Sequence, residues 1–568
     1  MGAMHVLSAA EMQACDRVTT ERYGIPSLQL MRAAAAAVSA VARQQFPRAR
    51  RVTVLCGRGN NGGDGMMAAR LLVEAGLDVT TLLIGSAGIP AGDAGVAWNE
   101  LTNPICGRVY AVTSAPEFER HQEALDADLI VDALLGTGFK PPLRGMALAA
   151  LNWVRASKAP ILAVDLPSGW PADETGATMD EFVSHPTDKD QPVGGPVFPA
   201  DVVVTFTAPK PAHVFGQLTR RWNQPIVVAP IGSPDEAIVS ALRIDWAGSA
   251  LALVQTPRPA AANKGNFGHV LVVGGSFGSA GGKSGAPAMA ALAAMRAGAG
   301  LVTAAVPAPA LAAVAAVTPE LMTWSLEPTA SGQIAAKNLV PERLSTLLAG
   351  KTVLAIGPGL GQSAETTKFA TGLLSATKMP TVIDADALNI LATKPVLIAK
   401  LAKGRTLVLT PHPGEMARLA GISVSEVQAN RLERARGFAE RMGVTLVLKG
   451  ARTLIAHPDG RVAVNTSGNP GMAKGGSGDV LTGLIAGMLA QYPGEAARAV
   501  EAAVYLHGLA ADWAVRKTGE HALLATDSLH CLPRAFRFQG YSFRERGPKG
   551  YVWLQGALRA AALCEGRG

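Results

Sequence analysis

The stretch NTSGNPGMAKGGSGDVLTG, from Asn465 to Gly483, is rich in glycine and holds one carboxylate, Asp479, directly before an apolar helical pattern. Glycine has no Cβ, and a helix N-terminus presents unpaired N–H groups and a positive dipole, so such a loop is suited to binding phosphate. Asp479 could cap the helix, which would contribute about 0.5–2 kcal/mol. It could instead act as a base beside a bound phosphate. The spacing alone leaves both interpretations open.

The sequence around this stretch alternates between strand and helix patterns. Apolar runs before it are HVLVVGGS, GLVTAAVP, KTVLAIGPG, PTVIDAD, TLVLTPH and VTLVLKG. A hairpin is predicted to turn at Asp459-Gly460, and two long helices are predicted near 479–491 and 496–516. The first half repeats the alternation with RVTVLCG, DVTTLLIG, ADLIVDALLG, APILAVDLPSG, ADVVVTFTAP and QPIVVAPIG. Strands separated by helices predict an α/β protein with two mostly parallel sheets, each in a three-layer αβα arrangement.

Length and composition predict a globular, cytoplasmic protein of roughly two to four domains. The chain has 568 residues, of which 48% are apolar and 17% charged, and its net charge of +8 is spread thinly. Nucleic-acid binding is therefore not expected. The five cysteines form no C-x-x-C pair, which is typical of reduced thiols. The first residues lack a signal-peptide pattern, and the Ala-rich stretch Gly285–Val317 is broken by Arg296 and several prolines, so no membrane span is expected.

Domain boundaries are predicted where the apolar patterning lapses, around Gly232–Asn263, which resembles a linker. We predict a first domain over 1–235, a second over 236–537 and a tail of unknown role over 538–568. A polar, proline-rich loop is predicted over Asp180–Asp201, between two strands of the first domain.

The second half contains several blocks that resemble one family. They are NKGNFGHVLVVGGS, RAGAGLVTAAVP, IGPGLGQ, DADALNIL, LTPHPGEMARL, LKGARTLI and GNPGMAKGGSGDVLTG, in this order. They are similar to the ADP/ATP-dependent NAD(P)H-hydrate dehydratases, which belong to the ribokinase-like superfamily. The resemblance covers about Arg258–Pro533 and implies a ribokinase-like fold.

That resemblance implies roles for particular residues. The implied contacts to the hydrated nicotinamide nucleotide are Ala286, Gly361, His412 and Asp479. The implied contacts to ADP or AMP are Lys449, Gly450, Ala451, Arg452, Thr453 and Gly478. The implied anion hole is formed by Gly475, Gly476, Ser477 and Gly478. Asp479 is the implied catalytic base. His412 could also be a capping histidine, and Lys449 a surface lysine; we favour ligand contact for both.

The first half has its own glycine-rich loop, GNNGGDG, between a predicted strand and a helix predicted from Gly65. It is not in the G-x-G-x-x-G register of dinucleotide-binding folds. Asn60 and Asn61 tolerate positive φ, so a tight structural turn is one interpretation. Two adjacent asparagines and an acid at the carboxyl end of a strand favour a binding site instead.

This half resembles the NAD(P)H-hydrate epimerases, also called YjeF N-terminal-like, and their Rossmann-like fold. The matching blocks, within about Val6–Phe215, are VLSAAEMQACDRVTTERYGIPSLQLM, GNNGGDG, IVDALLGTGFKPPLRG, AVDLPSGW and TFTAPKPAHVF. The implied substrate contacts are Asn60, Asn61, Gly62, Gly63, Asp64, Gly136, Thr137, Gly138, Phe139, Lys140, Pro141, Pro142 and Asp165. The implied potassium ligands are Asn61, Asp132 and Ser168. Asp165 is the implied catalytic acid–base, although it could instead form an Asx turn before Pro167.

Two positions depart from the families' usual patterns. Arg32 stands where an epimerase usually has an acid, which predicts reduced epimerase activity if that acid positions the substrate. The passage from Gly274 to Ala286 is longer than usual, which could displace Ala286.

Together the two resemblances imply a bifunctional repair enzyme. The first domain would interconvert R and S forms of hydrated NADH or NADPH (NADHX, NADPHX). The second would dehydrate the S form with ADP or ATP, accompanied by Mg²⁺, giving AMP and phosphate from ADP. The resemblance also implies a homo-oligomer. The alternatives are a ribokinase-like small-molecule kinase and a first half that only binds ligands.

Overall fold

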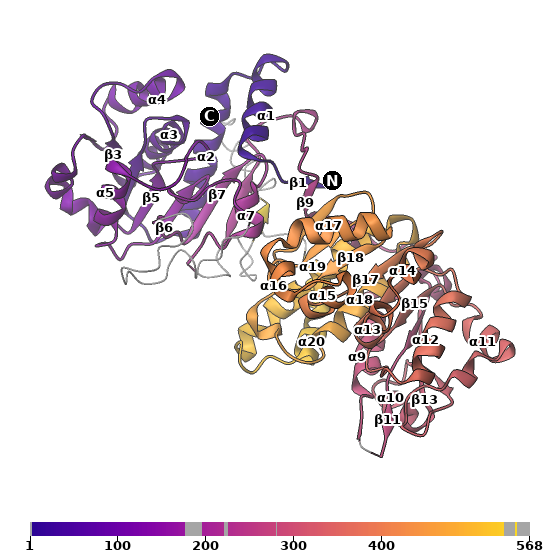
Figure 1. Ribbon diagram of the computed structural model, residues 1–568. Helices are drawn as coiled ribbons and strands as arrows, with labels where there is room; N and C mark the ends of the chain where they lie inside the picture. Colours follow the sequence, from indigo (N-terminus) through magenta and orange to yellow (C-terminus); the bar gives the residue numbers. More distant parts are fainter. Residues whose placement is uncertain (1–2, 176–195, 221–224, 280, 539–550, 554–568) are drawn as a thin grey trace. The chain divides into compact units, whose positions relative to one another are not determined.

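The computed structural model describes residues 3–175, 196–220, 225–279, 281–538 and 551–553. The chain forms two compact units, and the boundary between them lies between Leu242 and Arg243. Each unit is built on one large sheet (Figure 1). The sequence placed the boundary after Asp235; the structure places the next residues, up to Leu242, with the first unit. Most of the predicted loop over Asp180–Asp201 lies outside the described residues.

The first unit contains a parallel sheet with the strand order β21-β8-β7-β6-β5-β2-β3-β4. Its strands are β2 (Arg51–Cys56), β3 (Asp78–Ile84), β4 (Arg108–Val112), β5 (Leu129–Ala133), β6 (Ile161–Val164), β7 (Val202–Phe206), β8 (Ile226–Ala229) and β21 (Tyr551–Trp553). This is the doubly wound, Rossmann-like order that was predicted. Chain order reverses between β2 and β5, and ligands of such sheets bind at the carboxyl ends of the strands beside that point.

Helices cover both faces of this sheet, as the three-layer prediction requires. One face carries α2 (Ser27–Gln45), α3 (Asn60–Glu74) and α4 (Gly92–Thr102); the other carries the 3₁₀ segment η1 (Ala115–Asp126) and α5 (Gly145–Val154). Successive side chains of a strand point to opposite faces, so Val54 and Leu55 of β2 are fully buried in separate cores. The predicted tail lies outside the described residues apart from Phe538 and β21, which adds an edge strand to this sheet.

The glycine-rich loop of the first unit is helical, which corrects the prediction of a turn followed by a helix from Gly65. Helix α3 begins at Asn60, and neither asparagine has a positive φ. A Cβ on Gly62 would lie 1.8 Å from the carbonyl oxygen of Gly57, and one on Gly65 would lie 2.4 Å from Ala133 Cβ. These glycines therefore serve close packing of α3 onto the sheet more than flexibility.

The second unit contains a sheet with the order β1-β9-β20-β19-β18-β17-β16-β15-β10-β13-β14. Its strands are β1 (Met4–His5), β9 (Ile244–Trp246), β10 (His269–Val273), β13 (Leu301–Pro307), β14 (Met322–Leu326), β15 (Val353–Ile356), β16 (Thr381–Ile383), β17 (Leu407–Leu409), β18 (Thr445–Leu448), β19 (Leu454–Ala456) and β20 (Val462–Val464). The run from β14 to β18 is parallel, and β19 and β20 form the predicted hairpin. Strand β9 falls within the predicted linker, so the linker prediction was wrong at these residues. The strand has only three residues, which are too few to show an alternating pattern.

A glycine allows helix α18 (Ser477–Gln491) of the second unit to pack closely on α9 (Gly285–Ala297). Helix α18 follows the opening stretch and packs on α9. A Cβ on Gly483 would lie 1.9 Å from the carbonyl oxygen of Ala290. Helix α19 (Ala496–Thr518) packs beside α18, so both predicted long helices are confirmed. Across the described residues, no helix combines the length and apolarity that crossing a bilayer needs.

Candidate active sites

In the first unit, Asp165 is the centre of a buried hydrogen-bonded group. It follows β6 with a φ of 65°, a left-handed conformation that non-glycine residues rarely adopt. Its Oδ1 accepts hydrogen bonds from Lys210 Nζ and Thr205 Oγ1, both at 2.8 Å, and the Lys210 side chain is 2% exposed. The side chain thus bonds across to residues that follow or belong to β7, so the Asx-turn interpretation is wrong.

His213, as a neutral ring, forms hydrogen bonds to the backbone of both residues of this ion pair. Its Nδ1 accepts a hydrogen bond from the backbone N–H of Lys210 at 2.9 Å. The hydrogen of the neutral ring is therefore on Nε2, which donates to the carbonyl oxygen of Asp165 at 2.8 Å. Burial lowers the pKa of His213 to about 4, so the ring is uncharged at neutral pH.

Two further carboxylates act on the same pair. Asp16, on α1 (Ala9–Glu21), has a buried Oδ1 without a hydrogen-bond partner among the described residues, and burial raises its pKa to about 6. Burial also raises the pKa of Asp64, on α3, and the charges of Asp165 and Asp16 add to that rise. Burial is the largest effect on Asp165 and opposes its ionisation too, but the Lys210 ammonium and the other nearby charges and hydrogen bonds together outweigh burial, so the pKa of Asp165 is lowered. The cluster therefore combines an ionised carboxylate with two that retain protons more readily.

Two of the predicted potassium ligands, Asp132 and Ser168, belong to or follow β5 and β6, the neighbouring strands next to Asp165. Asp132, in β5, is 0% exposed; its Oδ1 accepts from Ser168 Oγ at 2.6 Å and its Oδ2 from Ser168 N–H at 2.8 Å. Burial raises the pKa of Asp132 to about 6. A Cβ on Gly136 would lie 3.2 Å from Asn61 Cγ, so the loop after β5 packs on the start of α3. The other predicted contacts, Thr137–Pro142, continue that loop at the surface.

In the second unit, Asp479 stands in the first turn of α18 but does not cap it. The N-cap residue is Gly476, with a φ of 96°, and no side chain caps the helix, so the capping interpretation is wrong. The N–H groups of Gly475, Gly476 and Gly478 have no acceptor among the described residues. Burial raises the pKa of Asp479 to about 6, and the nearby Asp384 charge adds to the rise. A base that titrates near neutral pH thus lies beside free backbone donors.

Lys449 belongs to this site and is no surface lysine. It follows β18, and its Nζ lies 2.9 Å from Asp384 Oδ1, with the lysine side chain 21% exposed. Thr410 and Thr482 also donate to Asp384, each at 2.8 Å. A Cβ on Gly478 would lie 3.3 Å from Lys449 Nζ, so the structure brings these two predicted nucleotide contacts together. The remaining predicted nucleotide contacts, Gly450 to Thr453, form the turn between β18 and β19.

His412 is the N-cap residue of α15 (Pro413–Ala420). Its Nδ1 accepts from Gly414 N–H at 3.0 Å, and its own N–H donates to Glu415 Oε2 at 2.8 Å. Burial lowers the pKa of His412, yet half of its side chain stays exposed. It therefore caps the helix and still presents an uncharged edge, and its contact to substrate stays a prediction.

A second acid, Asp386, organises the opposite side of this site. Asp386 Oδ2 accepts from Gly361 N–H at 2.9 Å and lies 3.4 Å from Lys283 Nζ. Between Asp384 and Asp386 stands Ala385, with a φ of 48°. Asp384 therefore bonds to Lys449 while Asp386 bonds to Lys283.

The passage from Gly274 to Ala286, which the sequence predicts to be longer than usual, forms a small hairpin before α9. Strands β11 (Phe277–Gly278) and β12 (Gly281–Gly282) form a small hairpin, which Lys283 N–H closes by donating to Ser276 O at 2.7 Å. Ala286 stays in the first turn of α9, where its Cβ would be 3.3 Å from a Cβ on Gly359. The residues before Lys283 thus form a hairpin beside the site, ahead of helix α9.

Several residues of the two candidate sites were not predicted from the sequence. They are Asp16, Thr205, Lys210 and His213 in the first unit, and Lys283, Asp384, Asp386 and Glu415 in the second. Most stand inside the quoted blocks VLSAAEMQACDRVTTERYGIPSLQLM, TFTAPKPAHVF, DADALNIL and LTPHPGEMARL, so charged residues within those blocks were the available signal.

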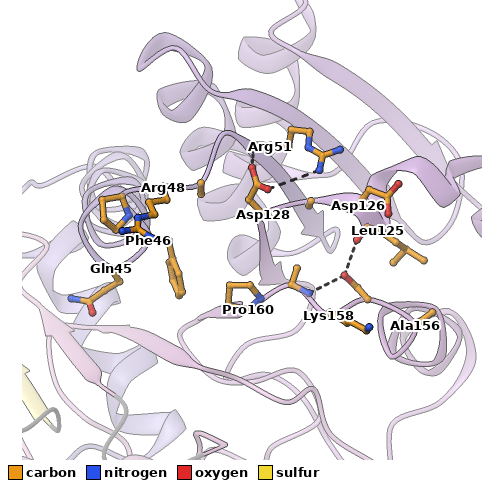
Figure 2. A pocket seen from close by; sticks show the side chains of 15 residues that line it. Gln45, Phe46, Arg48, Arg51, Leu125, Asp126, Asp128, Ala156, Lys158 and Pro160 are labelled. Atoms are coloured by element: carbon orange, nitrogen blue, oxygen red, sulfur yellow. Dashed lines mark hydrogen bonds and ion pairs between the residues drawn. The ribbon is translucent and has the colours of Figure 1, made fainter.

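A cavity of about 920 Å³ lies elsewhere in the first unit (Figure 2). It is lined by residues that precede β2, β5 and β6, including Arg48, Asp126 and Lys158. Arg51 Nη2 lies 3.9 Å from Asp128 Oδ1 at its edge. Parallel strands start at one edge of a sheet and end at the other, so this cavity is opposite the edge that carries Asp165.

Comparison with known proteins connects the two sites to one family. Residues 27–212 match the family described as YjeF-related protein N-terminus, and residues 270–534 match the family described as NAD(P)H-hydrate dehydratase. The bifunctional NAD(P)H-hydrate repair enzyme Nnr of Moorella thermoacetica is 41% identical over 549 residues, which cover 94% of this chain and 97% of that protein. The enzyme of the same name from Escherichia coli is 36% identical and covers 93% of each chain.

A solved structure is similar to the second half alone. It is the crystal structure of ADP/ATP-dependent NAD(P)H-hydrate dehydratase from Bacillus subtilis, co-crystallised with ATP/Mg²⁺. It is 32% identical, covers 51% of this chain and 96% of that chain, and has a TM-score of 0.43. On the identity and coverage of the full-length relatives, this chain belongs to the family of bifunctional NAD(P)H-hydrate repair enzymes, with an epimerase domain followed by a dehydratase domain.

Proposed function

We propose that Asp165 and its neighbours interconvert R- and S-NAD(P)HX, and that Asp479 and its neighbours dehydrate the S epimer with ADP or ATP. The observation that carries this proposal is that each domain holds a carboxylate with a shifted pKa beside a lysine and a glycine-rich helix start. Perturbed carboxylates at the carboxyl ends of strands are the usual machinery of proton transfer.

The epimerase step needs both a proton donor and a proton acceptor. Inverting the hydroxyl-bearing ring carbon requires a bond to that carbon to break and to re-form on the other face. A departing hydroxyl takes up a proton, and returning water gives one up. Asp165, whose pKa is lowered, is the acceptor, while Asp64 and Asp16, whose pKa values burial raises, are the donors. Such acid–base assistance contributes roughly 10²–10⁴-fold.

The residues proposed to hold potassium fit a hard cation. Asn61, Asp132 and Ser168 offer amide, carboxylate and hydroxyl oxygens, which such an ion prefers. Asp132 is completely buried, and among the described residues no lysine or arginine forms an ion pair with it. A bound K⁺ would supply the missing positive charge. The Ser168 hydroxyl, which accepts from Leu135 N–H at 2.9 Å, links that charge to the loop after β5.

In the dehydratase step, Asp479 removes the proton of the substrate hydroxyl as its oxygen attacks the terminal phosphoryl group of the nucleotide. The free N–H groups of Gly475, Gly476 and Gly478 stabilise the transferring phosphoryl group, an arrangement whose loss commonly costs about 10²–10³ in rate. Phosphate then leaves with loss of a ring proton, which restores NAD(P)H; ADP becomes AMP. Lys449 would contact the nucleotide phosphates, and Mg²⁺ bound with the nucleotide would neutralise part of their charge.

The residues proposed to contact NAD(P)HX in the dehydratase are supported by the placement of Ala286, Gly361 and Asp479 around one site. The four cysteines within the described residues are free, which supports a reducing, cytoplasmic location. The homo-oligomer stays a prediction.

Chiral chromatography of NADHX epimers with purified protein tests the division of labour. Asp165→Asn should stop R/S exchange and leave ADP-dependent loss of the S form intact; Asp479→Asn should do the reverse. Loss of both activities in both folded variants would contradict the proposal. A stable phosphorylated product without dehydration would identify a kinase. Unchanged exchange in Asp165→Asn would remove Asp165 from the mechanism, and absence of R/S exchange in the wild type would leave the first domain with a binding role alone.

A further inference from the structure

Lys283 follows a small hairpin, β11–β12, at the dehydratase site. The N–H of Phe277 donates to Gly332 O at 2.8 Å, and the N–H of Lys283 donates to Ser276 O at 2.7 Å, so both ends of the hairpin are fastened. The Lys283 side chain is 62% exposed, and its Nζ lies 3.4 Å from Asp386 Oδ2. The same carboxylate oxygen accepts from Gly361 N–H, which places the ammonium beside a predicted substrate contact.

The ammonium of Lys283 has spare hydrogen-bonding capacity. A lysine carries three donors, and among the described residues its one ion-pair and hydrogen-bond partner is Asp386. Lys449, by contrast, is mostly buried and lies within 3.8 Å of both Asp384 and Glu415. Lys283 is thus the more available cation for a ligand.

Two lysine–aspartate pairs act on Asp479. Both Asp384 and Asp386 raise its pKa, after burial, while Lys449 and Lys283 lower it, so all four charges are close enough to act on it. The Lys449–Asp384 pair adjoins Gly478, on the side predicted to hold the nucleotide. The Lys283–Asp386 pair adjoins Gly361, on the side predicted to hold the hydrated dinucleotide. The second pair therefore lies on the side predicted to hold the substrate.

We propose that Lys283 binds a phosphate group of the dinucleotide substrate and so determines the affinity of the dehydratase for NADHX or NADPHX. This inference rests on the proposed function of the Asp479 site. Both substrates carry a diphosphate bridge, and NADPHX adds a 2′-phosphate. A lysine ammonium is a compact point charge suited to either group.

Steady-state kinetics of Lys283→Ala and Lys283→Arg, with S-NADHX and S-NADPHX at saturating ADP, test the inference. Loss of one charge-assisted contact should raise the substrate KM about tenfold in Lys283→Ala and change kcat less than about twofold. Lys283→Arg should restore most of the affinity. The matched control is Lys337→Ala, because Lys337 is 61% exposed and pairs with Glu327 at 3.2 Å; its KM should match the wild type.

The pattern of KM values identifies the phosphate. A rise for NADPHX alone assigns the 2′-phosphate, and a rise for both substrates assigns the diphosphate; either result supports the proposal. Unchanged KM for both substrates, or a rise in the KM for ADP alone, would overturn it. Titration calorimetry of S-NADPHX with Asp479→Asn, with and without Lys283→Ala, measures the contact without turnover. Failure of the wild type to dehydrate would instead refute the function proposed for the site.

Discussion

Asp165 Oδ1 lies 2.8 Å from Lys210 Nζ, and 2% of the lysine side chain is exposed. Moving two charges out of water costs several kcal/mol each, which their attraction offsets only when further hydrogen bonds are present. Thr205 Oγ1 supplies one such bond to Asp165, and the Lys210 ammonium also donates to Thr205 Oγ1 at 2.8 Å. Such a pair is weak evidence for stability, so we infer that it is kept for the chemistry at Asp165.

Replacing Lys210 with methionine should leave Asp165 as an unpaired buried carboxylate. We expect the free energy of unfolding at pH 7 to fall by about 3–5 kcal/mol. In the wild type the pKa of Asp165 is lowered, so its contribution to stability is present above the unfolded pKa and is lost only as pH falls through the folded one. Without Lys210, burial raises the pKa of this carboxyl, so its protonation relieves the penalty as pH falls towards the unfolded pKa. The deficit of the variant should therefore shrink towards pH 4. Urea unfolding at both pH values measures it; exposed Lys158→Met is the control, and an equal deficit at both pH values would contradict the argument.

The pH dependence of dehydration should report Asp479. Burial and the Asp384 charge raise its pKa to about 6, and the proposed base must be ionised. We expect kcat/KM to rise between pH 5 and pH 7 with a midpoint near pH 6, and Asp479→Asn to lower it by about 10²–10⁴. Stopped assays of S-NADHX loss across this range check both. A flat profile would exclude Asp479 as the base.

The sequence predicted the sheets well because each strand is a continuous apolar run between turn residues. Strands such as β4 and β14, which are partly exposed and polar, and the three-residue β9 did not show that pattern. The helix start at Asn60 was missed because glycines usually signal a turn, whereas here they allow close packing against Gly57 and Ala133. Sequence spacing could not show which residues partner Asp165 or Asp479, because Lys210 and Asp384 reach them from other strands of the sheet.

Asp16 should lower the stability of the fold when its carboxylate is ionised, and it should support R/S exchange. Its pKa rises to about 6 in the folded state through burial, so the ionised form destabilises the fold increasingly from about pH 4 to pH 6. Asp16→Asn should therefore raise the free energy of unfolding by about 1–3 kcal/mol at pH 7.5 and leave it unchanged near pH 3.5. R/S exchange should fall while dehydration is unaffected. Denaturant titrations with epimer assays test this; an active, stabilised variant would remove Asp16 from the mechanism.

Asp512, on α19, should position the loop that precedes the anion hole. Its Oδ2 accepts from Gly468 N–H and its Oδ1 from Asn469 Nδ2, both at 2.9 Å. In Asp512→Asn the new side-chain NH₂ would face either Gly468 N–H or Asn469 Nδ2, so two donors would meet and one hydrogen bond would be lost. We expect the KM for ADP to rise about tenfold, which corresponds to one buried hydrogen bond lost. R/S exchange in the same molecule is the internal control, and a proportional loss of both activities would indicate general unfolding instead.

Two helical glycines of the dehydratase domain should respond oppositely to alanine. A Cβ on Gly483 would lie 1.9 Å from Ala290 O, where α18 packs on α9, whereas nothing lies within 4 Å of one on Gly437. Gly483→Ala should therefore destabilise the domain by about 1–3 kcal/mol through overpacking. Gly437→Ala, inside α17 (Arg431–Met442), should stabilise it by about 0.5–1 kcal/mol, because glycine loses more backbone entropy on folding. Thermal and urea unfolding measure both changes; a neutral Gly483→Ala would show that the two helices can move apart at little cost, and Asp479 with them.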